Sequence, residues 1–368
     1  MASGPGTTDL PNLTPRDRVI LTTAASEFEP EVTYLNTATM GLPPHRSWTA
    51  LQEALHEWRS GRFVPTSSDT WVARARTAYA NLVNVNPSEV AIGSQVSPLV
   101  GLIAAALPAG CEVLTAIGDF TSVLFPLHVQ AARGVRVREV PLGRLADAVG
   151  RGTSLVAFSA VQSADGRVAD LDAIEEACAE TGTQILVDVT QAVGWLPVDA
   201  SRYSYTVSGG YKWLLAPRGT AYLTVQSDLV SGLLPLSAGW YAGADAWEST
   251  YGTPLRLASD ARRFDVSPVW YSWIGAAPAL DLLLEVGPRA LHAHSVELAN
   301  RFCTGVGLQS TDSAIVSVFA DAEAARLMHD AGIVASVRGG RLRLSFHLCN
   351  TYKDVDRAVE VLVGHVRN

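Results

Sequence analysis

The sequence predicts an α/β protein in which a mostly parallel sheet, covered by helices on both faces, is followed by a smaller α+β C-terminal domain. Two observations support this prediction. Between residues 85 and 225, short apolar or β-branched runs alternate with longer segments of helical periodicity. After residue 235 the alternation stops, and a Gly/Ala-rich connection precedes long helical patterns. A chain of 368 residues is long enough for about two domains.

In the first region, we interpret each apolar run as a strand and each longer periodic segment as the helix that follows it. The expected pairs are Val90–Gly93 with Val100–Leu107, Glu112–Thr115 with Leu124–Ala132, and Leu155–Phe158 with Leu171–Glu180; further strands are expected at Ile185–Asp188, Ser204–Ser208 and Thr220–Val225. Sites in open α/β sheets lie beyond the carboxyl ends of the strands. The residues that follow these strands are therefore site candidates: Ser94, Gln95, Asp119, Phe120, Ser163, Asp188 and Ser208.

The C-terminal region predicts a different arrangement. Helices are expected at about Trp270–Val286, Arg289–Gly305, Ala322–Ala331 and Tyr352–Val366, and strands at Ser313–Phe319 and Arg341–Phe346. We expect an N-terminal tail and arm over residues 1–33, a large domain over 34–240 and a small domain over 241–368. Roughly the first 15 residues are expected to form a loose tail.

The charge balance argues against strongly anionic partners. The chain has 28 Lys and Arg against 36 Asp and Glu, a formal net charge of -8, and no basic tract. We therefore expect neither nucleic acid nor a membrane surface as a partner. The longest apolar windows, 98–107 and 269–280, are shorter than the roughly 20 residues of a membrane span. The N-terminus lacks the pattern of a signal peptide, so a cytoplasmic protein that acts on a small molecule is expected.

The spacing of cysteine and histidine indicates neither a disulfide framework nor a metal site. The four cysteines are far apart, with no C-x-x-C pair. His292 and His294 form an H-x-H pattern, but no third ligand is suitably spaced. We expect no bound metal.

Only two of the 28 basic residues are lysines, Lys212 and Lys353. Lys212 follows a predicted strand and a glycine pair, and its neighbours are Tyr211, Trp213 and two leucines. Apolar surroundings keep an amine neutral, and a neutral amine is what attack on an aldehyde requires. The alternative is a solvated surface lysine, which is the role we expect for Lys353 at a helix start.

Two further features precede Lys212 in the chain. Asp188 ends an apolar strand, with Gln191 three residues later. A carboxylate at this position caps a helix, holds a metal or pairs with a cationic ring nitrogen. Residues 93–98 (GSQVSP) turn from a strand into a helix, whose backbone N–H groups form an anion site, usually for phosphate. Any capped helix start has a similar pattern.

In chain order, this turn, Phe120, the Asp188-x-x-Gln191 pair and Lys212 resemble the fold-type-I pyridoxal-phosphate enzymes, and more narrowly the class V aminotransferase and cysteine desulfurase family. The similarity runs from residues 34–43 (YLNTATMGLP) to residues 343–346 (RLSF). Its most specific parts are the K-W-L…P-x-G string and the Asp-x-x-Gln pair. The resemblance implies a seven-stranded sheet in the large domain and pyridoxal 5′-phosphate as the cofactor.

The resemblance also implies a role for each matching residue. Lys212 would form a Schiff base with the cofactor and move the substrate's Cα proton, and Asp188 would pair with the protonated ring nitrogen. Arg343 would grip the substrate α-carboxylate, with Thr39 as a further substrate contact. The other implied cofactor contacts are the backbone amides of Gln95 and Val96, Ser208 at the phosphate, Gln191 at the phenolic oxygen, Phe120 stacked on the ring, and Ser163 and Tyr211 beside it.

Ser267, in an Asp-Val-Ser-Pro string, matches a family turn that reaches the phosphate of a neighbouring subunit. The resemblance therefore implies a homodimer with shared active sites. The chain departs from the family pattern at the phosphate end. Tyr211 replaces a histidine, an extra glycine is present at 209–210, and Gln95 and Val96 replace Thr-Glu.

The choice among the family's reactions is narrowed because a thiol is absent at the position where the family's desulfurases need one. Residues 331–341, shortly before Arg343, contain no cysteine, and Cys349 is expected to be a packed hydrophobic residue. Within the family, the chain most resembles the carbon–sulfur lyases that cleave hercynylcysteine sulfoxide by β-elimination to ergothioneine, through its sulfenic acid, with pyruvate and ammonia. The alternatives are an aminotransferase, an epimerase, a general cysteine S-conjugate lyase or a non-catalytic cofactor-binding module.

The trimethylammonium group of that substrate suggests a role for aromatic residues near the predicted domain junction. Trp240, Trp270 and Tyr271 are candidates for an aromatic cage around it. Packing in the core or at a subunit interface is the alternative for these three residues.

Overall fold

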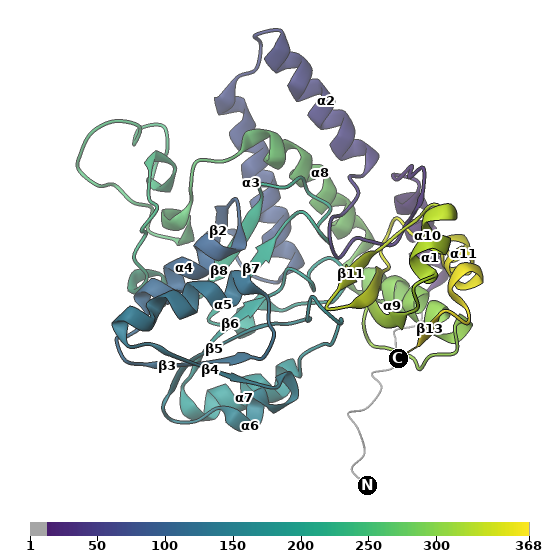
Figure 1. The fold of residues 1–368 in the computed structure, drawn as a ribbon. Helices are drawn as coiled ribbons and strands as arrows, with labels where there is room; N and C mark the ends of the chain where they lie inside the picture. The colour runs from purple at the N-terminus through teal and green to yellow at the C-terminus, as the bar shows by residue number, and fades with distance from the viewer. Residues whose placement is uncertain (1–12, 368) are drawn as a thin grey trace.

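The computed structural model describes residues 13–367 and confirms the predicted α/β class (Figure 1). Its large sheet has seven strands in the order β2-β8-β7-β6-β5-β3-β4. These are Val90–Gly93 (β2), Glu112–Ala116 (β3), Arg136–Val140 (β4), Thr153–Ser159 (β5), Gln184–Asp188 (β6), Tyr205–Gly209 (β7) and Ala221–Val225 (β8). Only β8 runs against its neighbours β2 and β7. The other six strands therefore end at one edge of the sheet.

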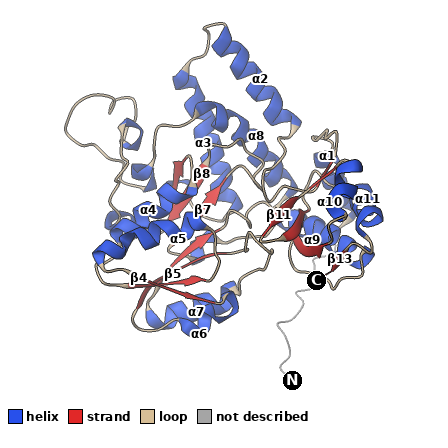
Figure 2. Ribbon diagram, viewed as in Figure 1, coloured by secondary structure: helices blue, strands red, loops and turns tan. Residues whose placement is uncertain are grey.

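Successive residues of the central strands enter two separate cores. On β6, Ile185 and Val187 join the core that includes α3 (Pro65–Leu82), α7 (Leu171–Thr181) and α8 (Trp270–Val286). Leu186 joins the core that includes α4 (Val96–Ala106) and α5 (Thr121–His128). Figure 2 shows helices on both sides of the sheet. Burial on both faces explains why these strands are continuous apolar runs in the sequence.

Strand β4 was not predicted, and the helix expected to reach Ala132 ends earlier. The α-helix α5 stops at His128 and continues as a 3-10 turn over Val129–Arg133. Strand β4 pairs only with β3, at the margin of the sheet. A strand at the margin of a sheet needs fewer apolar side chains. Its sequence therefore contains charged residues such as Arg136 and Arg138 and lacks the continuous apolar run by which the other strands were predicted.

The N-terminal arm contains a helix. Helix α1 (Pro15–Ala25) begins with a capping box in which Thr14 and Asp17 bond each other's backbone N–H groups. Most of the predicted loose tail, residues 1–12, lies outside the described residues. Helix α2 (His45–Arg59) and α3 follow, and both pack on α8. The predicted domain boundary at residue 240 stays a prediction, and α8 beyond it packs against helices of the preceding part.

The C-terminal part forms a four-stranded antiparallel sheet in the order β11-β12-β9-β13 with its own core. Its strands are Ile315–Ala320 (β9), Ser336–Arg338 (β11), Arg341–Ser345 (β12) and Val366–Arg367 (β13), and its helices are α9 (Pro288–Gly305), α10 (Ala324–Asp330) and α11 (Tyr352–Leu362). A short parallel pair, β1 (Thr33–Tyr34) with β10 (Ile333–Val334), joins the arm to this part. Helix α6 (Leu145–Ala148) completes the α-helices of the described chain. None of the helices described is long and apolar enough to cross a membrane.

Candidate active site

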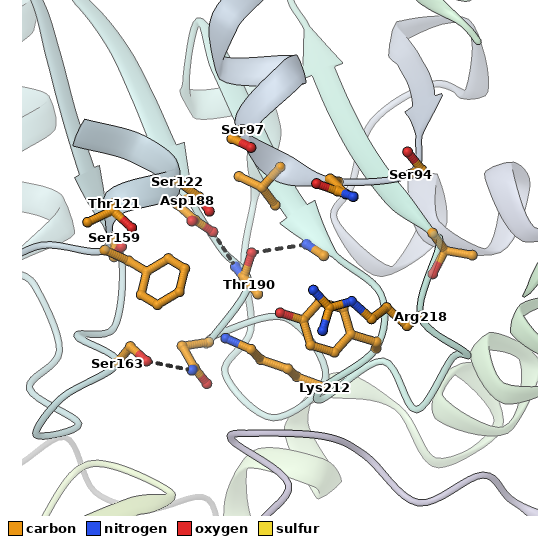
Figure 3. A pocket seen from close by; sticks show the side chains of 17 residues that line it. Ser94, Ser97, Thr121, Ser122, Ser159, Ser163, Asp188, Thr190, Lys212 and Arg218 are labelled. Carbon is orange, nitrogen blue, oxygen red and sulfur yellow. Dashed lines mark hydrogen bonds between the residues drawn. The ribbon is translucent and has the colours of Figure 1, made fainter. Parts of the chain in front are cut away.

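A cavity of about 280 Å³ lies at the sheet edge where the parallel strands end (Figure 3). Its walls come from the segments after β2, β3, β5, β6 and β7 and from the segment before β8. The lining residues are Ser94, Gln95, Val96, Ser97, Phe120, Thr121, Ser122, Ser159, Ser163, Asp188, Thr190, Gln191, Gly209, Tyr211, Lys212, Arg218 and Thr220. The topology thus brings together most of the candidates that the sequence indicated after the strands.

Lys212 follows β7 and is 6% exposed. Its Nζ lies 5.4 Å from the Phe120 ring centroid and 5.7 Å from that of Tyr211. Burial lowers the pKa of Lys212 to about 8, and the positive charges of Arg343 and Arg338 act in the same direction, while Asp188 opposes them. About a tenth of this amine is therefore neutral at pH 7, far more than for a solvated lysine.

The backbone around Lys212 is held by close contact with residues 36–41. The Gly41 N–H donates to the Tyr211 carbonyl oxygen at 2.9 Å. A Cβ at Gly41 would lie 2.1 Å from the Lys212 carbonyl oxygen, so only glycine permits this approach. Residues 34–43, part of the predicted family similarity, thereby support the lysine.

Asp188 is a buried carboxylate at the end of β6, 5% exposed. Desolvation raises its pKa to about 6, although the Thr190 backbone N–H, which donates to Oδ1 at 2.8 Å, and the charge of Lys212 lower it. Thr190 Oγ1 in turn accepts the Gly209 N–H at 3.0 Å. Thr190, which was not among the predicted site residues, ties the end of β6 to the end of β7; its position between Asp188 and Gln191 was the only signal in the sequence.

Gln191 connects four segments. Its Nε2 donates to the Ala38 carbonyl oxygen at 3.0 Å and to Ser163 Oγ at 3.1 Å, and its Oε1 accepts the Trp213 indole N–H at 2.7 Å. Both Nε2 hydrogens are thus engaged within the chain. A hydrogen bond from Gln191 to a cofactor's phenolic oxygen, which the resemblance implies, stays a prediction and requires one of these bonds to be exchanged.

Arg343 on β12 is 1% exposed and extends toward the same residues. Its Nη1 donates to the Ser163 carbonyl oxygen and, at 3.2 Å, to Ser163 Oγ, and its Nη2 donates to Thr39 Oγ1 at 2.8 Å. Nε is buried without an acceptor among the described residues. Burial and the nearby charge of Arg338 lower the pKa of Arg343 to about 10. The predicted substrate residues Thr39 and Arg343 therefore lie together, beside Ser163 in the cavity wall.

One end of the cavity is a turn with unpaired backbone donors. Helix α4 begins at Val96 with Gln95 as its N-cap, so its first N–H groups have no partner within the helix. Strand β8 pairs antiparallel with β2, Gly93 opposite Ala221, which brings Thr220 beside this turn. The hydroxyls of Ser94, Ser97 and Thr220 line the same end. Helix N-termini of this kind suit phosphate.

Phe120 is positioned by a neighbour whose role the sequence did not reveal. Asp119 is buried, and its carboxylate accepts the Phe120 N–H at 2.6 Å and the Ser159 N–H at 2.7 Å, together with the Ser159 hydroxyl. This network joins the ends of β3 and β5 and holds the Phe120 ring at the cavity. Asp119 was expected at a strand end, but its sequence pattern indicated no partner.

Other predicted site residues lie elsewhere. Ser208 does not line the cavity, because β7 alternates and the next residue, Gly209, faces it. Ser267 is exposed and outside the cavity of its own chain. Their predicted phosphate contacts stay predictions. Arg218, which was not among the predicted site residues, also lines the cavity, with Cζ 5.2 Å from the Tyr211 ring centroid.

The aromatic candidates form two groups outside the cavity. Trp270 Nε1 donates to Asp69 at 3.1 Å, and Trp240 packs on Trp247, whose Nε1 also donates to Asp69. Tyr271 packs between Trp58 and Phe63, with centroid distances of 5.5 and 5.0 Å. None of the three predicted cage residues lines the cavity that contains Lys212. Their contact with substrate stays a prediction.

None of the four cysteines lines the cavity. All four are free thiols, and Cys178, Cys303 and Cys349 are buried. Desolvation raises the pKa of Cys349 to about 12, as expected for a packed hydrophobic residue. Among residues 13–367, no group of three or more His, Cys, Asp or Glu side chains could hold a metal ion.

Comparison with known proteins agrees with this geometry. The sequence model of the aminotransferase class-V family matches residues 64–319. An uncharacterized aminotransferase of Bacillus subtilis, YcbU, is 27% identical over 319 residues, which is 79% of this chain and 82% of that protein. A probable hercynylcysteine sulfoxide lyase of Mycobacterium tuberculosis is 27% identical over 354 residues, 86% of this chain and 85% of that protein.

Among solved structures, a mutant of the protein C-DES with glycine covalently linked to its PLP cofactor superposes with a TM-score of 0.82. The match covers 96% of this chain and 100% of that chain at 21% sequence identity. At that identity the similarity establishes the shared fold.

Proposed function

Because the chain belongs to the class V aminotransferase family, we propose that it is a pyridoxal-phosphate-dependent carbon–sulfur lyase that cleaves hercynylcysteine sulfoxide by β-elimination. The products are the sulfenic acid that precedes ergothioneine, pyruvate and ammonia. The observation that supports a working amino-acid site most strongly is that a buried amine of lowered pKa and a buried carboxylate line one cavity, with the buried guanidinium of Arg343 bonded to Ser163 in its wall.

The residues around the cavity fit pyridoxal 5′-phosphate. Lys212 offers a desolvated amine for the aldehyde, and Asp188 is a buried carboxylate with unused acceptor capacity for a protonated ring nitrogen. The N-terminus of α4 and the hydroxyls of Ser94, Ser97 and Thr220 suit a phosphate group. When bound, the cofactor supplies an electron sink for the substrate's Cα.

The chain's own residues then divide the work of elimination. Arg343 and Thr39 hold the substrate carboxylate, which orients Cα toward Lys212. The Lys212 nitrogen accepts the Cα proton, and sulfur leaves Cβ as a sulfenate. The Cβ–S bond of a sulfoxide breaks more readily than that of a thioether, because the sulfenate that leaves is stabilised. The 2-aminoacrylate that remains takes up water and breaks down to pyruvate and ammonia.

Elimination is favoured over desulfuration because no thiol is positioned to receive sulfur. Within the described residues, three of the four cysteines are buried, and none lines the cavity. The substrate proposal is supported by the similarity to the probable hercynylcysteine sulfoxide lyase, which spans most of both chains. The similarity to YcbU supports the second candidate, an aminotransferase.

We also propose that the protein works as a cytoplasmic homodimer. Ser267 is exposed outside the cavity of its own chain, so a contact between Ser267 and a phosphate requires a second copy. Helix α2 exposes Trp48, Leu55 and Trp58, and the segment before α8 exposes Leu234, Leu236, Tyr251 and Leu255. A second copy of the chain would cover this apolar surface.

A pyruvate assay tests the proposed reaction. The purified holoenzyme is given hercynylcysteine sulfoxide, a simple S-alkyl cysteine sulfoxide and cysteine, and we expect the fastest pyruvate release from the first. Lys212→Ala should abolish turnover and the visible absorbance near ~420 nm, while the matched control Lys353→Ala should retain both. Conversion of the substrates to 2-oxo acids with amino transfer, without pyruvate, would instead identify an aminotransferase.

A further inference from the structure

Two guanidinium groups converge on one hydroxyl beside the cavity. Arg343 Nη2 lies 2.8 Å from Thr39 Oγ1, and Arg338 Nη2 lies 3.4 Å from the same oxygen. The other acceptors of Arg343 belong to Ser163, and the other acceptor of Arg338 is the Val337 carbonyl oxygen. Every acceptor of the two arginines in the described chain is therefore neutral.

The charges of this pair are not compensated. The charged group that acts most on Arg343 is Arg338, and it lowers the pKa of Arg343 as a like charge does. Arg343 is 1% exposed, and its buried Nε has no acceptor. Like charges held together in a partly desolvated place, with a donor unused, are stabilised by an anion that enters from outside the chain.

The strand register explains why the two side chains meet. Strands β11 and β12 form a hairpin in which Ser336 is opposite Arg343 and Arg338 is opposite Arg341. Residues that are paired across two strands project to the same face, and so do residues two apart on one strand. Arg338 is two residues after Ser336, the partner of Arg343, so the side chains of Arg338 and Arg343 lie on the same face of the hairpin. Gly339 and Gly340, with φ of 55° and 77°, form the two-residue turn that places Arg338 at the end of β11.

We propose that Arg338 is a second anion-binding residue of the active site, and that Arg338 and Arg343 together hold a single carboxylate of the substrate. One group is inferred, not two, because both guanidiniums point at one oxygen. We call these two side chains the arginine clamp. Arg343 is buried and holds a fixed position, whereas Arg338 is exposed at the end of the hairpin, so the carboxylate enters beside Arg338. The proposal rests on the proposed function only in taking an amino acid as the substrate.

The clamp also acts on Lys212 at a distance. Both guanidinium charges lower the pKa of Lys212. An anion bound between them offsets these charges, so carboxylate binding raises the pKa of the Lys212 nitrogen. Removing the charge of Arg338 also raises it, and leaves less for the anion to offset.

The holoenzyme allows this effect to be measured without turnover. The pH midpoint of its visible absorbance change reports protonation of the Lys212 nitrogen. We expect Arg338→Gln to raise this midpoint by about 0.5 unit and to weaken the upward shift caused by propionate. The matched control is Arg341→Gln, since Arg341 is on the same hairpin but packs on Phe319, 4.0 Å from its ring centroid.

Steady-state kinetics give a second measurement. Loss of one charge-assisted hydrogen bond should raise KM for the eliminated amino acid about tenfold with little change in kcat, and Arg338→Lys should recover part of the loss. An unchanged midpoint, propionate response and KM in Arg338→Gln would overturn the proposal. If no substrate releases pyruvate, the proposed reaction fails, whereas the absorbance titration still decides whether the clamp exists.

Discussion

Two buried side chains with oppositely shifted pKa values define the chemistry of the cavity. Desolvation lowers the pKa of Lys212 to about 8 and raises that of Asp188 to about 6. Both pKa values are shifted because each group loses hydration when it is buried, and attraction to the opposite charge compensates only part of that loss. The site therefore holds an amine that is readily neutral and a carboxylate that is costly to keep ionised.

The lowered pKa of Lys212 predicts the pH dependence of cofactor capture. Only the neutral amine attacks an aldehyde, so the capture rate of the cofactor-free protein should rise about tenfold per pH unit below pH 8 and level off above it. Stopped-flow absorbance with added pyridoxal phosphate measures this rate. A rate that keeps rising beyond pH 10 would show an ordinary solvated lysine.

The raised pKa of Asp188 predicts a conflict between stability and activity. A carboxyl group whose pKa is higher in the folded state than in the unfolded state destabilises the fold increasingly as pH rises from the unfolded pKa to the folded pKa, and by the full amount above it. The free energy of unfolding of the cofactor-free protein should thus fall as pH rises from about 4 to about 6.

Asp188→Asn should remove this penalty of up to about 3 kcal/mol, because an amide carries no charge. The hydrogen bond from the Thr190 N–H is kept, because the amide oxygen still accepts it. Denaturant unfolding of the cofactor-free variant at pH 7.5 should show the gain, while kcat falls about a hundredfold or more for lack of the carboxylate. Lower stability in the variant would contradict the assigned cost of burying Asp188.

Among the helices and strands, one buried ion pair connects three segments near the end of the cavity where α4 begins. Arg76 on α3 binds Asp265 with an Nη2–Oδ2 distance of 2.6 Å, and Asp265 also accepts the Ile92 N–H of β2 at 2.8 Å. Ile92 lies just before the turn at Ser94. The pair therefore holds in place the strand from which α4 begins.

Arg76→Ala should reduce the free energy of unfolding by about 3–5 kcal/mol, because Asp265 is left buried and unpaired. Cofactor affinity should also fall, since the turn after β2 loses its support. Urea unfolding and equilibrium dialysis measure these effects. The double variant Arg76→Met with Asp265→Leu should lose less stability than Arg76→Ala; an equal or greater loss would contradict this account.

Over the surface of the chain, exposed apolar side chains gather on α2 and on the segment that leads to α8. Trp58 is 63% exposed and Tyr251 is 87% exposed. Figure 1 shows α2 projecting from the rest of the chain. Side chains of this size are rarely left in water in such numbers, so the surface is suited to a second copy.

The dimer proposal predicts a mass near twice 39.1 kDa by light scattering after gel filtration. Trp58→Glu should shift the protein toward the monomer, because a buried charge without a partner opposes association. Arg144→Glu is the control. Arg144 is exposed next to α6, far from α2 in Figure 1, so this variant should leave the mass unchanged. A monomeric wild-type protein would contradict the proposal.

The sequence was sufficient for the fold class and for most of the cavity. Apolar runs such as residues 185–187 predicted buried parallel strands, and the residues after them predicted where Lys212, Asp188 and Gln191 would meet. Strand β4 was missed because an outer strand does not need a continuous apolar run. The aromatic cage was inferred from closeness to the predicted domain junction; the rings of Trp240 and Trp270 lie outside the cavity of their own chain, and their contact with substrate stays a prediction.

By itself, the sequence determined that one lysine follows a buried strand in apolar surroundings, because periodicity and composition are local properties. Only the tertiary structure decided that Gly209, not Ser208, faces the cavity, that Thr190 joins two strand ends, and that Arg338 meets Arg343. These facts depend on strand register and on contacts between residues up to about 300 positions apart. The pKa shifts of Lys212 and Asp188 likewise arise from burial, which exists only once the chain has folded.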